Sequence, residues 1–411
     1  MSLATDIDTF ADLMKSQGPA FLSGENDILN LASKRTYTLT RFLQGKTKEE
    51  MLQGGSKIKD TIMFNARSDY QHYKPNQEFD YSNPQVLNEW EVDWRFTTDN
   101  MQWTDHELGL NSGQMTKTAK IHRFKSLKRK LEMNMMTNFL NQMDNDLWLQ
   151  PNAATMEGAA GTAPYSIPVF INEWSNASSA ANGAGGTSGS GLPGHPAGGT
   201  VWTKIQNIAP GSGGISGGKW QNELVSYSDV AASSSENLFR ALSKMFYLLH
   251  YDRMPKQPSL GEASTWPNFI ATSLAGVLNF ERLLRVSQDA FLAGRQDPSF
   301  PNPTFRGVPV VYIEDLNTAS IFRTGATDTS FGNEASNANV ANGFASGPRY
   351  FVITGQYFCP VWHTERYFWK KNVDLPRQPF NHVQVVDCWH QFLARARNRN
   401  GLVYPSAAIT I

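Results

Sequence analysis

Residues 114–150 read QMTKTAKIHRFKSLKRKLEMNMMTNFLNQMDNDLWLQ and contain neither proline nor glycine. Pro151 follows, and proline ends a helix because it has no backbone N–H group to donate. Apolar residues recur in this stretch at spacings of three and four, which indicates one face of an α-helix. At 1.5 Å per residue, the sequence predicts a rod about 50 Å long. The apolar positions are Phe124, Leu127, Leu131, Met135, Phe139, Met143 and Leu147.

The first half of this predicted helix is basic. Seven lysines and arginines precede Glu132, its first acid. A solvated face is the simplest interpretation of such a run, and a face turned toward a polyanion or an acidic neighbour is the alternative. The basic residues are Lys117, Lys120, Arg123, Lys125, Lys128, Arg129 and Lys130.

Two strands are predicted before the helix. Residues 57–64 alternate with a period of two, and residues 89–96 do so more clearly. In the second strand one face is apolar and the other charged, which is typical of a half-buried antiparallel strand. Together the strands predict a long hairpin arm that rests on something else, because an isolated two-stranded ribbon is marginal in water. The apolar face holds Trp90, Val92, Trp94 and Phe96, and the charged face holds Glu89, Glu91, Asp93 and Arg95.

Residues 1–50 predict an arm rather than a domain. Their two short helical segments, 6–14 and 26–33, cannot bury an apolar face alone. A second segment without a domain pattern is 175–218, which contains 13 of the 32 glycines and predicts a low-complexity insertion.

The remainder alternates between helix and strand. Ser233 and Glu236 form a capping box ahead of an apolar helical face. Strands are predicted at 268–273, 308–313 and 350–353, with a helix at 280–290 and an extended block at 382–392. If that block continues as a strand, Arg395, Arg397 and Arg399 share one face. The helical face after the capping box is Leu238, Leu242, Met245 and Leu249.

Composition excludes several classes of protein. The 411 residues carry 37 basic and 37 acidic side chains, which argues against a strongly basic nucleic-acid binder. Two cysteines, Cys359 and Cys388, cannot form a disulfide framework. No apolar run reaches the ~18 residues of a membrane helix, and residues 1–8 lack the pattern of a signal peptide. We therefore predict a soluble protein made inside the cell.

Motifs for catalysis and metal binding are weak. Gly213 to Lys219 has a P-loop outline, but Trp220 stands where the motif needs Ser or Thr, and Gly214 to Gly218 fits a nucleophile elbow only by composition. Zinc ligation by Cys359, His363, His382, Cys388 and His390 is the less favoured interpretation, because the spacings are not those of zinc knuckles. The eight histidines are scattered singly. We expect no catalytic residue, metal or cofactor.

The order of these parts resembles a tailed-bacteriophage major capsid protein with the Hong Kong ninety-seven type of shell fold. Three short motifs are similar to one branch of that family: Gly213-Gly-Ile-Ser-Gly-Gly-Lys-Trp220, Thr304-Phe-Arg-Gly-Val-Pro-Val-Val311 and Tyr350-Phe-Val-Ile-Thr-Gly355. The resemblance implies an α+β fold in five parts. These are an N-terminal arm (1–50), an extended β-hairpin loop (51–105), a peripheral domain with a spine helix (106–164), an α/β axial domain (165–360, with the insertion 175–218), and a return to the peripheral domain with a C-terminal strand (361–411).

The resemblance also implies a function. Many copies would form hexamers and pentamers and close an icosahedral head shell around double-stranded DNA, bound without sequence specificity. Portal, scaffold and possible cement proteins are the expected partners, and no membrane is expected. The expected location is the virion, after synthesis in the host bacterial cytoplasm. Because the chain begins at Met1, we expect the scaffold to be a separate protein.

Six residues are predicted inter-subunit contacts. Trp90, Trp94 and Phe96 are aromatic anchors by this interpretation, since buried aromatic residues dominate interface energetics. Packing within the chain against the long helix is their alternative. Arg395, Arg397 and Arg399 are predicted to bridge subunits, because guanidinium groups suit carboxylates across an interface.

Alternatives to the capsid interpretation remain open. An encapsulin-like nanocompartment uses the same shell fold around cargo enzymes, and DNA inside purified particles would separate the two. A phage tail or decoration component would give rods or small rings. An intracellular enzyme of unknown chemistry is the third alternative, because residues far apart in sequence can still meet in a cleft.

Overall fold

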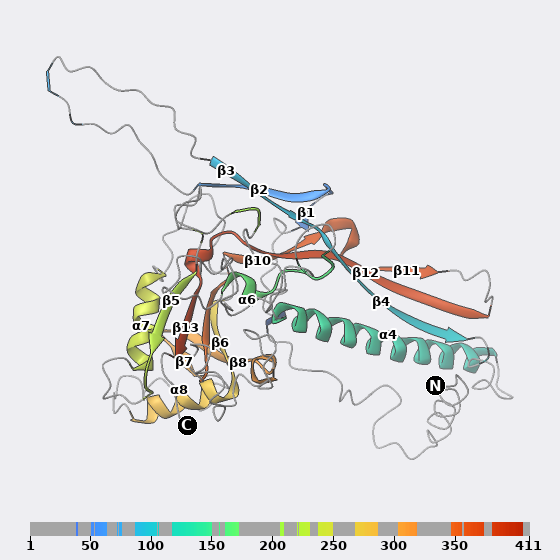
Figure 1. Ribbon diagram of the computed structural model, residues 1–411. Coiled ribbons are helices and arrows are strands. Elements are labelled where there is room, and N and C mark those ends of the chain that lie inside the picture. Colours follow the sequence, from blue (N-terminus) through green and yellow to red (C-terminus); the bar gives the residue numbers. More distant parts are fainter. Residues whose placement is uncertain are drawn as a thin grey trace, which may run out of the picture. The chain divides into compact units, whose positions relative to one another are not determined.

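Figure 1 shows a computed structural model of the chain. The predicted arm at 1–50 lies outside the described residues except for 38–39, and the Gly-rich insertion lies outside them except for 206–208. The structure describes residues 38–39, 51–52, 54–63, 72, 74–75, 87–104, 106, 117–149, 156, 161–171, 206–208, 220, 222–230, 237–249, 268–286, 303–318, 347–355, 357–373 and 380–405.

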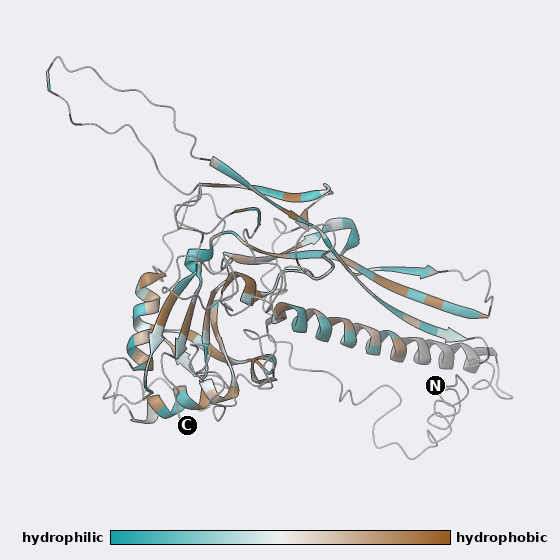
Figure 2. Ribbon diagram, in the orientation of Figure 1, coloured by the Kyte–Doolittle hydropathy of each residue, from teal (hydrophilic) through white to brown (hydrophobic). Residues whose placement is uncertain are grey.

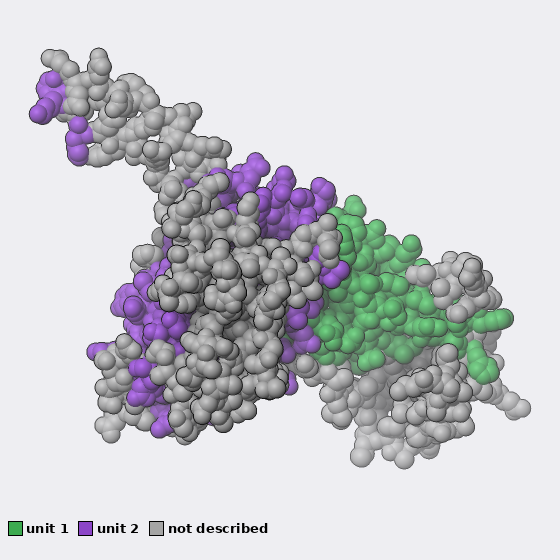
Figure 3. Space-filling view, in the orientation of Figure 1, with its two compact units in different colours: residues 1–36, 96–144, 362–389 green, residues 37–95, 145–361, 390–411 purple. Residues whose placement is uncertain are grey.

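The chain divides into two units, shown in green and purple in Figure 3. Unit 1 comprises residues 1–36, 96–144 and 362–389. Unit 2 comprises residues 37–95, 145–361 and 390–411. Each unit is therefore assembled from segments that are distant in sequence, and the predicted domain boundaries stay predictions.

The long predicted helix is confirmed as α4 (Lys117–Leu147). Its 31 residues give a length of about 46 Å at 1.5 Å per residue. Met135, Phe139, Met143 and Leu147 are all buried, as the apolar period predicts. The side chains of 117–130 lie outside the described residues, so the environment of the basic run stays a prediction.

Unit 1 contains most of a five-stranded sheet built on β12 (Asn381–Ala394), which confirms the extended block at 382–392. β11 (Trp369–Val373) pairs antiparallel with β12, and Trp369 lies opposite Asp387. β4 (Arg95–Thr104) also pairs with β12. Unit 1 also contains the end of β10 (Phe358–His363) and the 3₁₀ helix η3 (Thr364–Arg366), whereas β1 (Met51–Leu52) belongs to unit 2. The division between the units falls inside β4, β10 and β12.

The predicted hairpin of unit 2 is confirmed. β2 (Lys57–Met63) pairs antiparallel with β3 (Leu87–Asp93), with Ile58 opposite Val92 and Asp60 opposite Trp90. Ile58, Trp90 and Val92 are buried on one face. On the exposed face the Lys57 ammonium lies 3.0 Å from the Glu91 carboxylate.

The predicted alternation of residues 89–96 is wrong at its end. The strand is interrupted at Trp94, and the two residues that follow exchange their expected environments. Arg95 is buried and donates from Nη1 to the carbonyl of Gly161 and from Nη2 to that of Met156, each at 2.7 Å. Phe96 is 61% exposed. Two backbone carbonyls accept from the guanidinium and so allow it to be buried. Arg95 therefore lies on the buried face and Phe96 on the exposed face, the reverse of the prediction.

A six-stranded mixed sheet forms the centre of unit 2, in the order β5-β13-β9-β6-β8-β7. α7 (Leu238–Leu248) packs on β5 and β13, and α8 (Leu274–Val286) packs on β6 and β8. Hydrophobic residues run along these strands in Figure 2. The strand bounds are β5 Glu223–Tyr227, β13 Gly401–Pro405, β9 Tyr350–Thr354, β6 Asn268–Thr272, β8 Val308–Tyr312 and β7 Thr304–Phe305.

The strands predicted at 268–273, 308–313 and 350–353 are confirmed as β6, β8 and β9. The helix predicted at 280–290 is α8, which begins earlier, at Leu274. α7 is capped by Asn237, whose side chain accepts from the Arg240 backbone N–H at 2.8 Å. Ser233 and Glu236 of the predicted capping box lie outside the described residues.

The β7–β8 hairpin explains the predicted motif at 304–311. Its two turn residues, Arg306 and Gly307, have φ angles of 49° and 85°, as a two-residue type I′ turn requires. Phe305 is thereby placed in the core, in edge-to-face contact with Phe246 and Phe280. The motif is therefore structural. α6 (Ile167–Phe170), α10 (Asp315–Thr318) and the 3₁₀ helix η4 (Arg397–Arg399) are the remaining short elements.

Asp146, in the last turn of α4, predicts an unusual pH dependence. Burial raises the pKa of its carboxyl to about 6 from 3.8. Between these values the folded chain holds a proton that the unfolded chain has lost, so stability falls as the pH rises from about 4 to 6. Asp146→Asn should therefore stabilise unit 2 at pH 7.5 by up to about 3 kcal/mol and have little effect near pH 4.

The measurement is the free energy of unfolding of the unassembled chain at both pH values, with exposed Asp60→Asn as the control. A stability difference for Asp146→Asn that is the same at both pH values would contradict the assignment.

Candidate subunit-contact surface

Four side chains from separate elements meet on the sheet of unit 1, and we call Phe96, Arg366, Trp369 and Trp389 the aromatic–arginine cluster. The Phe96 and Trp389 rings meet edge to face, with centroids 4.8 Å apart. The Arg366 guanidinium carbon lies 4.2 Å from the centre of the Trp369 ring and 5.3 Å from that of Trp389. A cation thus lies between two indole rings, a favourable arrangement.

Asp387 and His363 hold the cluster in place. The Trp389 indole N–H donates to the Asp387 carboxylate at 3.0 Å, and Arg366 Nη1 lies 3.9 Å from the same oxygen. The ring centroids of His363 and Trp389 are 5.0 Å apart, and His363 Nδ1 accepts from the Glu365 backbone N–H. Because its rotamers are fixed in the single chain, the cluster loses little conformational entropy on contact with a partner.

The cluster is only partly covered. Phe96 is 61% exposed and Trp369 is 38% exposed, while Arg366 and Trp389 are half-buried. Aromatic side chains and arginine are enriched in protein interfaces and at their energetic hot spots. This part of unit 1 therefore has the chemistry of a contact surface.

The three predicted aromatic anchors have different environments. Trp90 and Trp94 are buried within the single chain, and the Trp94 indole N–H donates to the Gly55 carbonyl at 3.0 Å. Their burial fits the alternative of packing within the chain, while packing against the long helix stays a prediction. Phe96 is the one whose side chain is open to a partner, and its role between subunits stays a prediction.

The three arginines do not share a strand face, because β12 ends at Ala394 and η4 begins at Arg397. Arg397 is fully buried. Its Nε and Nη2 donate to the Phe170 carbonyl at 3.0 and 2.9 Å, and its Nη1 donates to the Trp220 carbonyl at 3.1 Å. Its guanidinium joins segments of one chain, so bridging between subunits does not fit it.

The other two arginines are half-buried. Arg399 Nη1 donates to the Leu249 carbonyl at 3.3 Å. For Arg395 and Arg399 the predicted bridging role stays a prediction.

Sequence reasoning missed Arg366, Trp369 and Trp389. Their residue types are typical of interfaces, but a sequence period does not reveal that β4 pairs with β12. That pairing brings Phe96 to Trp389 across 293 sequence positions, the difference between their numbers.

The metal interpretation gains no support from the geometry. Cys388 and His390 are both fully buried in β12. Within the described ranges, no three His, Cys, Asp or Glu side chains are grouped so as to hold a metal ion. Among those residues no helix is long and apolar enough to cross a membrane. Trp220 is buried, and Gly213 to Lys219 lie outside the described residues.

The sequence matches no known protein-family model and no curated protein. Solved structures do match, and they show that the chain has the fold of capsid subunits. A chain from the capsid of a native GTA particle aligns over 96% of this chain and 98% of its own, with a TM-score of 0.50 and 8% identity. A chain of the cyanophage A-1(L) capsid aligns over 96% and 99%, with a TM-score of 0.50 and 10% identity.

These two likenesses show the fold. The chain has the α+β fold of phage capsid proteins, which confirms the predicted fold class. An encapsulin from Synechococcus elongatus PCC 7942 aligns over 95% of this chain and 93% of its own at 9% identity, with a TM-score of 0.43, too low to argue from.

Proposed function

We propose that this chain is the major capsid protein of a tailed bacteriophage and builds an icosahedral head shell around double-stranded DNA. The observation that carries the proposal is that the alignments with capsid chains cover nearly all of both chains. They span 96% of this chain and nearly all of each matched chain. A capsid fold thus accounts for almost the whole length, and we propose a structural rather than a catalytic role.

The contact surfaces support self-assembly. The hairpin β2–β3 and the aromatic–arginine cluster offer apolar or charged surface on separate parts of the chain. Several modest contacts per subunit are enough for a stable closed assembly, because symmetry repeats each of them many times. Hexamers and pentamers of this chain are the proposed building blocks, with α4 as the spine helix and the six-stranded sheet in the axial domain.

The remaining partners follow from the same proposal. A portal, a scaffold and possible cement proteins would complete the head in the virion, after synthesis in the host cytoplasm. Packaged DNA would be held without sequence specificity. The balance of 37 basic and 37 acidic residues supports a container that tolerates DNA rather than a DNA-binding protein.

Sedimentation of the chain expressed alone tests assembly, and nuclease treatment of particles from infected cells tests their content. We expect megadalton particles in the first experiment and nuclease-protected double-stranded DNA in the second. Particles that contain an enzyme and no DNA would favour the encapsulin-like alternative.

Phe96→Asp should uncouple assembly from folding. The ring is 61% exposed, so the chain should keep its stability within about 1 kcal/mol. An unpaired carboxylate at the centre of a contact is costly to desolvate, and we expect at least a tenfold loss of particle yield. Sedimentation gives the yield, and Thr98→Asp, two residues along on the exposed side of β4, is the matched control. Equal particle yields for Phe96→Asp and the wild type would show that the aromatic–arginine cluster is not part of a subunit contact.

A further inference from the structure

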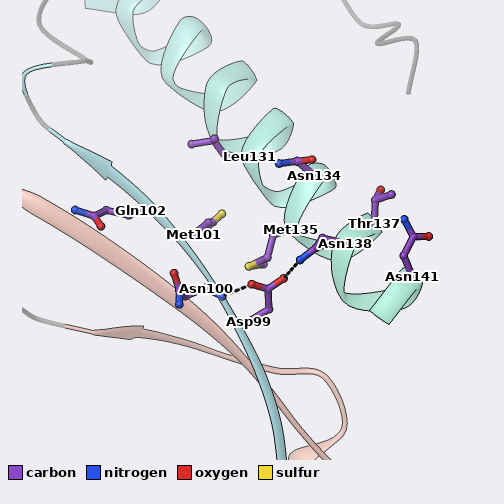
Figure 4. Close-up of a pocket in the computed structure, with 10 residues that line it drawn as sticks. All are labelled: Asp99, Asn100, Met101, Gln102, Leu131, Asn134, Met135, Thr137, Asn138 and Asn141. Atoms are coloured by element: carbon purple, nitrogen blue, oxygen red, sulfur yellow. Dashed lines mark hydrogen bonds between the residues drawn. The ribbon is translucent and has the colours of Figure 1, made fainter. Parts of the chain in front are cut away.

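A groove of about 350 Å³ lies between β4 and α4 in unit 1 (Figure 4). Its floor is apolar, formed by the buried side chains of Met101 and Met135, which both lie between β4 and α4 in Figure 4. Exposed amides of Asn134 and Asn138 lie along its α4 side, and Asn100 and Gln102 of β4 also line it, although their side chains lie on the face of the sheet away from α4. Methionine adapts its shape to a partner, and amides both donate to and accept from a peptide backbone.

The groove follows the edge of β4. Four consecutive residues, 99–102, line it, although their side chains alternate between the two faces of the sheet. A space that touches all four therefore runs along the side of the strand, where backbone N–H and C=O groups are presented.

β4 is an edge strand among the described residues. It meets β12 through Trp103 with His382 and through Phe96 with Trp389. β11 pairs with β12 at residues 383–387, within the same interval. Because one edge of a strand takes one partner, β4 and β11 lie on opposite edges of β12. The outer edge of each pairs with no other described strand.

The two outer edges have complementary charge. The β4 side carries Asp99, whose carboxylate accepts from Asn138 Nδ2 at 3.0 Å. The β11 side carries exposed Lys370 and Lys371. Lys370 forms an ion pair with Glu132 of α4, so both Asp99 and Lys370 lie on the face of the sheet that contacts α4.

We propose that β11 of a second copy adds to the outer edge of β4, so that the sheet continues from one subunit into the next. The proposal rests on the proposed function, which supplies the second copy. Lys370 of the second copy, which pairs with Glu132 of its own α4, then also approaches Asp99 on the α4 face. The backbone of the added β11 forms hydrogen bonds with β4. Strand addition supplies main-chain hydrogen bonds, and the charges set which edges meet.

This contact is head to tail, because each subunit offers a different edge on each side. Heterologous contacts of this kind close into rings when the rotation per subunit allows it. They also cover two strand edges that would otherwise be open to uncontrolled pairing. Both consequences suit a ring-forming shell subunit.

Cross-linking between two singly substituted chains tests the proposal. Asn100→Cys places a thiol on β4 and Lys371→Cys places one on β11, both at exposed positions on the face away from α4. The two proteins are assembled separately and as an equal mixture, then treated with a short bismaleimide. Linked peptides are identified by mass spectrometry, which also separates any linkage through native Cys359 or Cys388.

In the mixture we expect a cross-link between Cys at position 100 and Cys at position 371 (the 100–371 link). Its yield should be at least tenfold above that of the 100–100 and 371–371 links, which the separate assemblies can form. A mixture of Asn100→Cys with Lys59→Cys, exposed on the hairpin, is the control and should not give that yield. Normal shells without the 100–371 link would overturn the edge contact alone, as would 100–100 links at equal yield. Wild-type chains that form no assembly would overturn the proposed function and the edge contact together.

Discussion

Replacing Arg397 with methionine should lower the free energy of unfolding by about 3–5 kcal/mol, because it leaves buried acceptors without a donor. The side chain is fully buried and joins the carbonyls of Phe170 and Trp220 and the side chain of Asn222. Burial lowers the pKa of Arg397 to about 9, so the guanidinium is still charged at neutral pH. Methionine fills part of the space and donates to none of these oxygens.

Chemical denaturation of the unassembled chain measures the loss, with Arg395→Met as the matched control. Arg395 is half-buried just after β12, and its replacement should cost less than about 1 kcal/mol. Equal losses for the two variants would contradict the assignment of Arg397 to the interior of unit 2.

Trp94→Ala should have a comparable effect on folding, with a loss of about 3–5 kcal/mol. The indole is 5% exposed and its N–H donates to the Gly55 carbonyl, so truncation creates a cavity and removes a hydrogen bond. The result expected from the structure is therefore a less stable chain rather than a stable chain that fails to assemble. Thermal or chemical unfolding of the unassembled chain measures it.

Phe96→Ala, two positions along, is the control for Trp94→Ala. Since Phe96 is 61% exposed, its truncation should cost less than about 1 kcal/mol of stability. A stable Trp94→Ala chain with normal unfolding and poor assembly would instead restore Trp94 as an anchor between subunits.

The elements with strong local periods could be predicted from the sequence. α4 has an apolar repeat and no interrupting proline or glycine, and β2, β3 and β12 alternate over seven residues or more. The helical face of α7 also follows from spacing alone, because each of its apolar positions is buried in one core cluster. Such signals are local, so these elements can be predicted without knowledge of tertiary contacts.

The errors come from long-range hydrogen bonds. Arg95 was expected on a charged face, and its acceptors lie 61 and 66 residues further along the chain. Arg397 was expected on one strand face with Arg395 and Arg399, and Phe170, its acceptor, is 227 residues away. In both cases the arginine is buried because backbone carbonyls distant in sequence accept its hydrogen bonds. A local sequence pattern cannot predict such partners.

The candidate contact surface was only partly predictable for the same reason. Phe96 was identified from its alternation, although that alternation placed it on the wrong face. Arg366, Trp369 and Trp389 join it through strand pairing and through η3, a turn of three residues. The groove beside β4 likewise depends on how α4 lies along the strand.

Electron microscopy of the purified chain, expressed alone, tests the central claim most directly. The account predicts closed shells of uniform size, or flat sheets of hexamers, in which this fold repeats. A chain that remains a 45.8 kDa monomer at high concentration, with no shells or sheets in any field, would contradict it.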